Sequence, residues 1–159
     1  AKACEEWFGG YNIDPKEILN RQFDSEKYGQ QIIEGPIFFT SHCEHHLTPF
    51  FGEVWIGYVP KKYVTGLDKM VKITEVFARR LQIQERMTKQ IADSMFNVLE
   101  CDGVMVVVKA KHLCVNGRET RNYTTETITS AVKGVYTKPK KGYNAREEFL
   151  QLIQMKSKL

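Results

Sequence analysis

Two short clusters of metal-binding residue types constrain how this chain can fold. The first reads Ser-His-Cys-Glu-His-His at residues 41–46, and the second reads Lys-His-Leu-Cys at residues 111–114. Together they hold all four histidines and two of the four cysteines of the chain. Zinc accepts both thiolate sulfur and imidazole nitrogen, usually in tetrahedral geometry. We therefore expect the clusters to meet in the folded protein and to hold a zinc ion.

The spacing within each cluster suits shared ligation of one ion. Cys43 and His46 are three residues apart, so a turn lets their side chains converge. His112 and Cys114 are two apart on a predicted strand, which puts both on one face with α carbons about 6.6–6.8 Å apart. One residue of that pair can bind the metal while the other faces the further ligand that the metal binds.

The clusters offer more candidate ligands than a tetrahedral ion can use. We assign the metal to Cys43, His46 and Cys114, a set that leaves one position open, as catalytic zinc sites do. His45 and His112 then serve as acid–base groups, because histidine titrates near neutral pH. The fourth histidine, His42, is the expected bystander.

Three other interpretations of the clusters stay open on spacing alone. A closed site with two cysteines and two histidines would only join two hairpins and catalyse nothing. The clusters could also fail to meet. A nucleic-acid-binding zinc module is disfavoured, because the half-sites are too far apart in sequence for a finger and no basic recognition helix follows them.

Charge and cysteine usage limit the partners and the compartment. The net charge of +4 suits a small anionic substrate, but it is too small and too scattered to indicate nucleic acid. No apolar run approaches the roughly 18 residues of a membrane span. Four cysteines do not indicate a disulfide scaffold, and Cys4 and Cys101 are expected to be buried or spectator thiols. The implied compartment is reducing, hence the cytoplasm. The chain begins at Ala1 without methionine, so we expect N-terminal residues to be missing.

Hydrophobic periodicity predicts a single α+β domain over residues 1–159, with a helical N-terminal segment (1–29) and a catalytic core (30–159). Residues 23–29 are expected to form a turn. Strands are predicted at residues 31–41, 50–59, 103–114 and 124–136, and helices at 1–9, 14–21, 67–81, 83–101 and 145–155. These strands would form a four-stranded antiparallel sheet with helices on one side. Unpaired sheet edges are expected to join neighbouring subunits.

Several motifs resemble the GTP cyclohydrolase I family, over nearly the whole chain from about Lys2 to Leu150. They are Cys43-Glu44-His45-His46, Gly57-Tyr58-Val59-Pro60, Gly66-Leu67, the segment 79–91 with its Gln-Glu-Arg, and His112-Leu113-Cys114. The resemblance implies a tunnelling fold, in which subunits join their sheets into a barrel. It also implies a homodecamer of two pentamers, with active sites at subunit interfaces.

The resemblance further implies a reaction and roles for particular residues. GTP and water would give 7,8-dihydroneopterin triphosphate and formate, with Zn²⁺ lowering the pKa of water so that it attacks guanine C8. His112 corresponds to the acid that protonates N7, and His45 to a second proton-transfer group. Glu85 corresponds to the carboxylate that grips the guanine edge, with Gln84 helping to position the base.

The phosphate-binding end follows the family less closely. Lys69, Lys72, Arg118 and Lys2 match positions expected to bind the triphosphate. However, Asp68 stands where the family usually has serine, and a carboxylate beside a triphosphate repels it. Glu119 replaces a usual glycine after Arg118, and Lys72 replaces an arginine, which exchanges a bidentate fork for a point charge.

These departures motivate a hypothesis that the phosphate pocket is weakened or altered. The alternatives to GTP hydrolysis are then a family member acting on another guanine nucleotide, or one that stops at a ring-opened intermediate. A non-catalytic zinc-stabilised scaffold is the alternative from another class.

Overall fold

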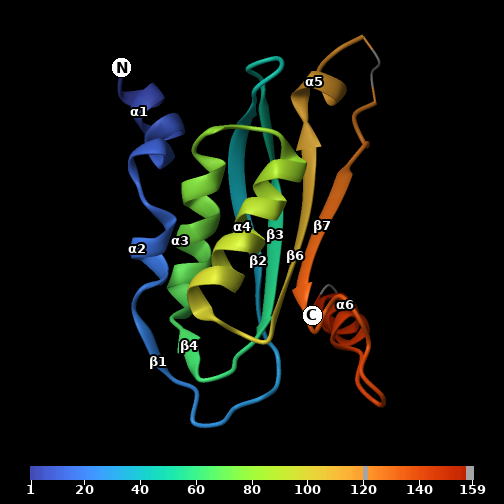
Figure 1. The fold of residues 1–159 in the computed structure, drawn as a ribbon. Coiled ribbons are helices and arrows are strands. Elements are labelled where there is room, and N and C mark those ends of the chain that lie inside the picture. The colour runs from blue at the N-terminus through green and yellow to red at the C-terminus, as the bar shows by residue number, and fades with distance from the viewer. Residues whose placement is uncertain (120–121, 157–159) are drawn as a thin grey trace.

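The computed structural model describes residues 1–119 and 122–156 (Figure 1). Its elements, in chain order, are α1 (Lys2–Phe8), the 3-10 helix η1 (Gly9–Asn12), α2 (Pro15–Leu19), β1 (Gln22–Asp24), β2 (Ile32–Cys43), β3 (Pro49–Val59), β4 (Tyr63–Thr65), α3 (Leu67–Ala78), β5 (Leu81–Gln82), α4 (Gln84–Leu99), β6 (Gly103–His112), α5 (Leu113–Asn116), β7 (Thr127–Gly134) and α6 (Ala145–Lys156). None of the helices in this described part is long and apolar enough to cross a membrane.

The main sheet has five strands in the order β5-β2-β3-β6-β7. The four long strands pair antiparallel, whereas β5 runs parallel to β2 and pairs with it only at His42 and Cys43. The prediction of a four-stranded antiparallel sheet is therefore corrected to a five-stranded mixed sheet. The two residues of β5 occupy the expected break between two helices, and two residues are too few to show an alternating pattern.

A second, two-stranded sheet joins β1 to β4. The sequence suggested a turn over residues 23–29, and β1 overlaps the start of that segment. The expected helix start at Asp14 is confirmed, because the Asp14 carboxylate accepts the Lys16 backbone N–H at 2.9 Å and Pro15 begins the helix.

One face of the main sheet packs against α3 and α4 (Figure 1). The alternation of β3 and β6 sends every second side chain toward these helices. The buried residues on this face of the two strands are Phe50, Val54, Ile56, Tyr58, Val104, Val106, Val108 and Ala110. The helices meet them with residues at helical spacing: Met70, Ile73 and Phe77 from α3, and Met87, Ile91 and Met95 from α4.

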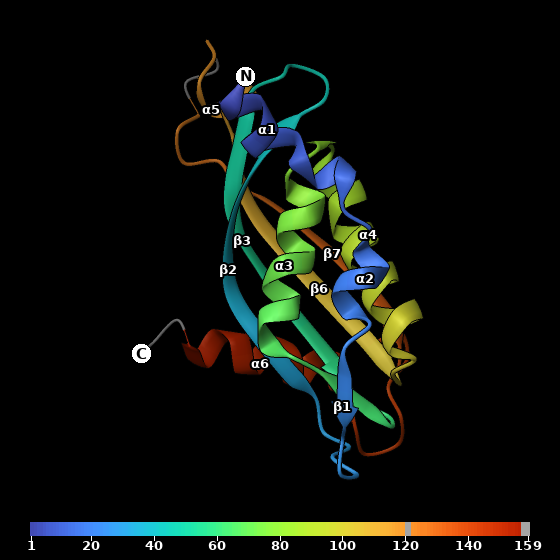
Figure 2. The same cartoon turned by 90° about the vertical axis from the view of Figure 1, so that its left-hand side faces the viewer.

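The opposite face of the sheet is covered at one end by α6 (Figure 2). Phe149 of α6 packs there with Val59 and Met105, and the prediction of helices on one side only is corrected accordingly. A Cβ at Gly57 would lie 2.6 Å from the Phe149 ring, so glycine at this position allows the close approach. Toward the other end of this face, Phe38 and Ile128 are exposed by 73% and 65%.

Candidate active site

An antiparallel hairpin of β2 and β3 carries the first cluster at its turn. Cys43 is the last residue of β2, and the turn is closed by two backbone hydrogen bonds. The Cys43 N–H donates to Thr48 O at 2.9 Å, and the Leu47 N–H donates to Cys43 O at 2.8 Å. This tight turn brings the Cys43 Sγ to 3.8 Å from the Nδ1 of His46.

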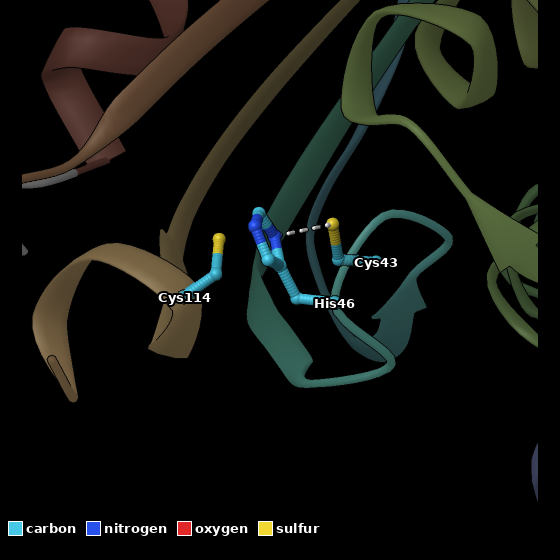
Figure 3. A group of neighbouring side chains, drawn as sticks. All are labelled: Cys43, His46 and Cys114. Atoms are coloured by element: carbon cyan, nitrogen blue, oxygen red, sulfur yellow. Dashed lines mark hydrogen bonds between the residues drawn. The ribbon is translucent and has the colours of Figure 1, made fainter.

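The second cluster reaches the same place from β6. Phe50 and His112 are register partners, so the end of β6 lies beside the start of β3. Cys114 then sits in the first turn of α5, not on a continued strand, which corrects the expected same-face pairing with His112. The ligand atoms of Cys43, His46 and Cys114 all lie within 4.8 Å of one another (Figure 3).

This donor set fits a zinc ion. Zinc–sulfur bonds of about 2.3 Å and zinc–nitrogen bonds of about 2.0–2.1 Å in a tetrahedron place sulfur and nitrogen about 3.6 Å apart. The measured separation of Cys43 Sγ and His46 Nδ1 is close to that value, at 3.8 Å. Within residues 1–119 and 122–156 this group offers two sulfurs and one imidazole, which leaves a fourth tetrahedral position.

His112 lies next to this group but is held by other contacts. Its Nε2 is 2.6 Å from the Oε1 of Gln84, and its ring stacks on Phe50 with centroids 4.5 Å apart and planes 3° apart. Its backbone N–H donates to Asn116 Oδ1 at 3.0 Å. Burial lowers the pKa of His112, against the opposing effect of the Glu85 carboxylate. An imidazole held in a fixed position is suited to proton transfer.

The other two histidines have different surroundings. His45 is exposed in the turn, and its ring centroid lies 6.3 Å from that of His46. His42 is buried against Trp7 and Phe8 of α1, with ring centroids 5.0 and 5.4 Å away. Burial lowers the pKa of His42. The structure thus gives His42 a packing role and leaves His45 accessible to a ligand.

The start of α4 brings the two predicted base-binding residues to the site. Glu85 is exposed in the first turn of the helix, close enough to His112 to affect its pKa. Gln84, in contrast, is only 1% exposed and is hydrogen-bonded to protein groups. It was expected to help position the base, but its side chain contacts His112.

Sequence reasoning missed an ion pair that ties the two halves of the site together. Arg86 of α4 donates to the Glu44 carboxylate from its two terminal guanidinium nitrogens, Nη1 at 2.5 Å and Nη2 at 3.0 Å. This bond with Arg86 lowers the pKa of Glu44. The Glu44 N–H also donates to Gln82 O of β5 at 3.0 Å, so the cluster turn is anchored both to β5 and, through Arg86, to α4. The only signal in the sequence was opposite charge in two of the motifs, 42 residues apart.

The predicted phosphate-binding residues are divided between the two ends of the sheet. Lys69 and Lys72 lie at the start of α3, directly after β4, where the Thr65 N–H donates to Tyr58 Oη at 3.1 Å. Tyr58 is eight residues from Phe50 along β3, or about 26 Å at strand rise. The lysines are therefore at the opposite end of the sheet from the cluster (Figure 1).

Lys2 and Arg118 are at the cluster end. Lys2 is exposed on α1, the helix whose Trp7 contacts His42, and Arg118 is exposed just after α5. Glu119 beside Arg118 is exposed as well. One chain thus brings together the expected metal and proton-transfer residues with Glu85, but not the lysines of α3.

Asp68 forms ion pairs with both Lys69 and Lys72. Its Oδ2 lies 2.9 Å from Lys72 Nζ and 3.6 Å from Lys69 Nζ. The hydrogen bond from Lys72 lowers the pKa of Asp68, so the carboxylate is ionised at neutral pH. The start of α3 therefore carries an internal anion at the point where the phosphates were expected.

Comparisons with known proteins identify a similar fold and a protein family. Over 67% of this chain and 94% of the other, the fold is similar to the apo crystal structure of the archaeosine synthase QueF-Like, with a TM-score of 0.51 and 16% identity. The chain is 44% identical over 153 residues to GTP cyclohydrolase 1 of Wolinella succinogenes, covering 96% of this chain and 80% of that protein. It is also 44% identical over 155 residues to GTP cyclohydrolase 1 of Parabacteroides distasonis, covering 97% and 77%. The family model of GTP cyclohydrolase I matches residues 1–154, and the chain therefore belongs to the GTP cyclohydrolase I family.

Proposed function

We propose that this protein opens the imidazole ring of GTP at C8, releases formate and forms 7,8-dihydroneopterin triphosphate. The observation that carries this proposal is the convergence of Cys43, His46 and Cys114 beside a fixed His112 in a member of this family. A closed structural zinc site is disfavoured because, among residues 1–119 and 122–156, the group of mutually close ligand atoms comes from Cys43, His46 and Cys114 and does not include His112.

Each residue of the site has a part in this proposal. Cys43, His46 and Cys114 would hold the zinc, which when bound activates water for attack at neutral pH. His112 gives a proton to guanine N7 as the ring opens, and His45 moves a second proton. The Glu85 carboxylate accepts hydrogen bonds from the ring N–H and the exocyclic amine of guanine, a pair of donors that adenine does not present.

We also propose that the complete site needs more than one copy of the chain. Lys69 and Lys72 lie at the opposite end of the sheet from Cys114 in one chain, so phosphate contacts from them require a neighbour. In the described part of the chain, β7 pairs with β6 alone. The strand β5 pairs with β2 at His42 and Cys43, and within the same described residues the rest of β2 pairs with β3 alone. Joining β2 of one copy to β7 of the next would extend the sheet, and a decamer of two pentamers is the assembly we expect. Light scattering of the purified protein measures the mass of the assembly, which should be ten times that of one chain.

The cysteines bear on where the enzyme works. All four are free thiols, and two of them belong to the proposed zinc site. A reducing compartment keeps such thiols available, so we place the protein in the cytoplasm.

The reaction is tested by incubating the zinc-loaded protein with GTP. We expect equimolar formate and a product with the absorbance and mass of dihydroneopterin triphosphate. A product that retains the formyl carbon would instead show an enzyme that stops at the ring-opened stage. No change in GTP would favour the non-catalytic scaffold.

A second candidate substrate is favoured by the ion pairs of Asp68. Because Lys69 and Lys72 are already paired with a carboxylate, the chain is a candidate for a guanine nucleotide with fewer phosphates. Comparing kcat/KM for GTP, GDP, GMP and guanosine separates the two candidates. A strong preference for GTP would rule out a nucleotide with fewer phosphates as the substrate.

The Asp68→Ser variant is expected to raise kcat/KM for GTP by about 2- to 5-fold. Removing the carboxylate frees Lys72 and Lys69 from their ion pairs, and a charge near a helix start is worth about 0.3–1 kcal/mol. The measurement is steady-state kinetics with GTP and with guanosine as its control. An equal gain on guanosine would show that the effect does not act through the phosphates.

A further inference from the structure

The hydrogen bonds of Gln84 fix which way its carboxamide points. Its Nε2 lies 3.2 Å from Val108 O and 3.0 Å from Thr127 O, and both of these are backbone carbonyl oxygens. Carbonyl oxygens only accept hydrogen bonds, so the NH₂ end of the amide must face them. The Oε1 end therefore faces His112.

Two threonine hydroxyls support the same orientation. Thr88 Oγ1 donates to the Gln84 backbone oxygen at 2.7 Å, and it lies 2.7 Å from Thr129 Oγ1. With its own hydrogen used, Thr88 accepts the hydrogen of Thr129. The Thr129 hydroxyl can then accept from Gln84 Nε2, which is 3.1 Å away, by sharing one of the two amide hydrogens with a carbonyl oxygen. Reversing the amide would put the Gln84 oxygen against two carbonyl oxygens. Because the Gln84 side chain is only 1% exposed, water could not relieve this repulsion.

This orientation decides the tautomer of His112. The Gln84 Oε1 has no hydrogen, so the Nε2 of His112, at 2.6 Å, must donate to it. In the neutral ring the Nδ1 then carries the lone pair. The ring is held in place by stacking on Phe50 and by the Nε2 bond to Gln84.

We propose that Gln84 is a positioning residue, which holds His112 as the Nε2–H tautomer and makes Nδ1 the atom that exchanges a proton with the substrate. The imidazolium would release its Nδ1 hydrogen to the substrate nitrogen and become the neutral Nε2–H ring. The bond to Gln84 is kept in both states, so the ring does not move during transfer. The proton-transfer role of His112 rests on the proposed function, whereas the tautomer does not.

The tautomer can be measured without any substrate. In zinc-loaded protein with ¹⁵N-labelled histidine, at a pH above the pKa of His112, long-range ¹⁵N–¹H NMR should show a protonated Nε2 and a bare Nδ1. The His112→Asn variant identifies the signal. In Gln84→Met the ring should populate both tautomers. A protonated Nδ1 in the unsubstituted protein, or no change in Gln84→Met, would overturn the inference.

Kinetics separate positioning from direct substrate contact. Gln84→Met should lower kcat for GTP about 100-fold, the scale of a misplaced catalytic group, with KM unchanged. Gln82→Met is the matched control for the side chain, because Gln82 is equally buried and its amide bonds Phe77 O and Gln90 instead of His112. The backbone oxygen of Gln82, which accepts the Glu44 N–H, is the same in this variant. In a His112→Ala background Gln84→Met should cost nothing further.

The outcomes distinguish this inference from the proposed function. A raised KM with an unchanged kcat in Gln84→Met would assign Gln84 to the substrate and reject the positioning role. A loss of kcat in Gln82→Met equal to that in Gln84→Met would reject it too, as a general effect of disturbing the core. If the unsubstituted protein does not act on GTP, the proposed function fails, and the NMR result still decides the tautomer.

Discussion

Replacing Cys114 with serine is expected to remove bound zinc and GTP hydrolysis together. A serine hydroxyl is a far weaker zinc ligand than a thiolate, and Cys114 supplies one of three ligand atoms within 4.8 Å of one another. Loss of the ion removes several kcal/mol of transition-state stabilisation, so activity should fall at least ~10³-fold. Metal content and formate release are the two measurements.

Cys4→Ser provides the matched control for the Cys114 variant. Cys4 is a free thiol exposed on α1, and we expect its replacement to leave the zinc content unchanged. A Cys114→Ser protein that keeps one zinc per chain and full activity would contradict the ligand assignment.

Replacing His112 with alanine is expected to lower kcat about 10²–10⁴-fold while zinc stays bound. The reason is the loss of a positioned acid, whose contribution is typically of this size. In the described part of the chain, the candidate metal group consists of Cys43, His46 and Cys114, and His112 lies outside it. The variant should therefore have the zinc content of the unsubstituted protein, as measured by metal analysis beside the kinetics.

His42→Asn is the control for removing an imidazole from this part of the chain. His42 packs against Trp7 and Phe8, so its replacement should affect stability more than kcat. If His112→Ala loses zinc along with activity, His112 is a fourth ligand and the site is a closed one.

The meeting of the two clusters could be predicted because residue type and spacing restrict zinc ligands so strongly. The path of the chain at Cys114 could not. The valines of β6 continue a strand pattern toward Cys114, but Asn116 accepts the His112 N–H with its side chain and the chain turns into α5. Local side-chain bonds of this kind compete with the strand and leave no periodic signal.

The contacts that organise the site from outside the clusters were also invisible in the sequence. Gln84 and His112 are 28 residues apart, and only the fold shows that the amide is turned toward the ring. The sequence did contain a signal for a helix on the second face of the sheet, where α6 lies. Trp55 and Val59 of β3 are apolar on the face opposite the main core, which indicates a second covering layer.

The most direct test of the central claim uses GTP labelled with ¹³C at C8 and the zinc-loaded protein. If the imidazole ring is opened and C8 is excised, the label should appear in free formate, in an amount equal to the pterin product. The same label should stay in GTP when His112→Ala is used at equal zinc content over the same time. Formate without label, or label that remains in the nucleotide with folded, zinc-loaded protein, would contradict the proposal.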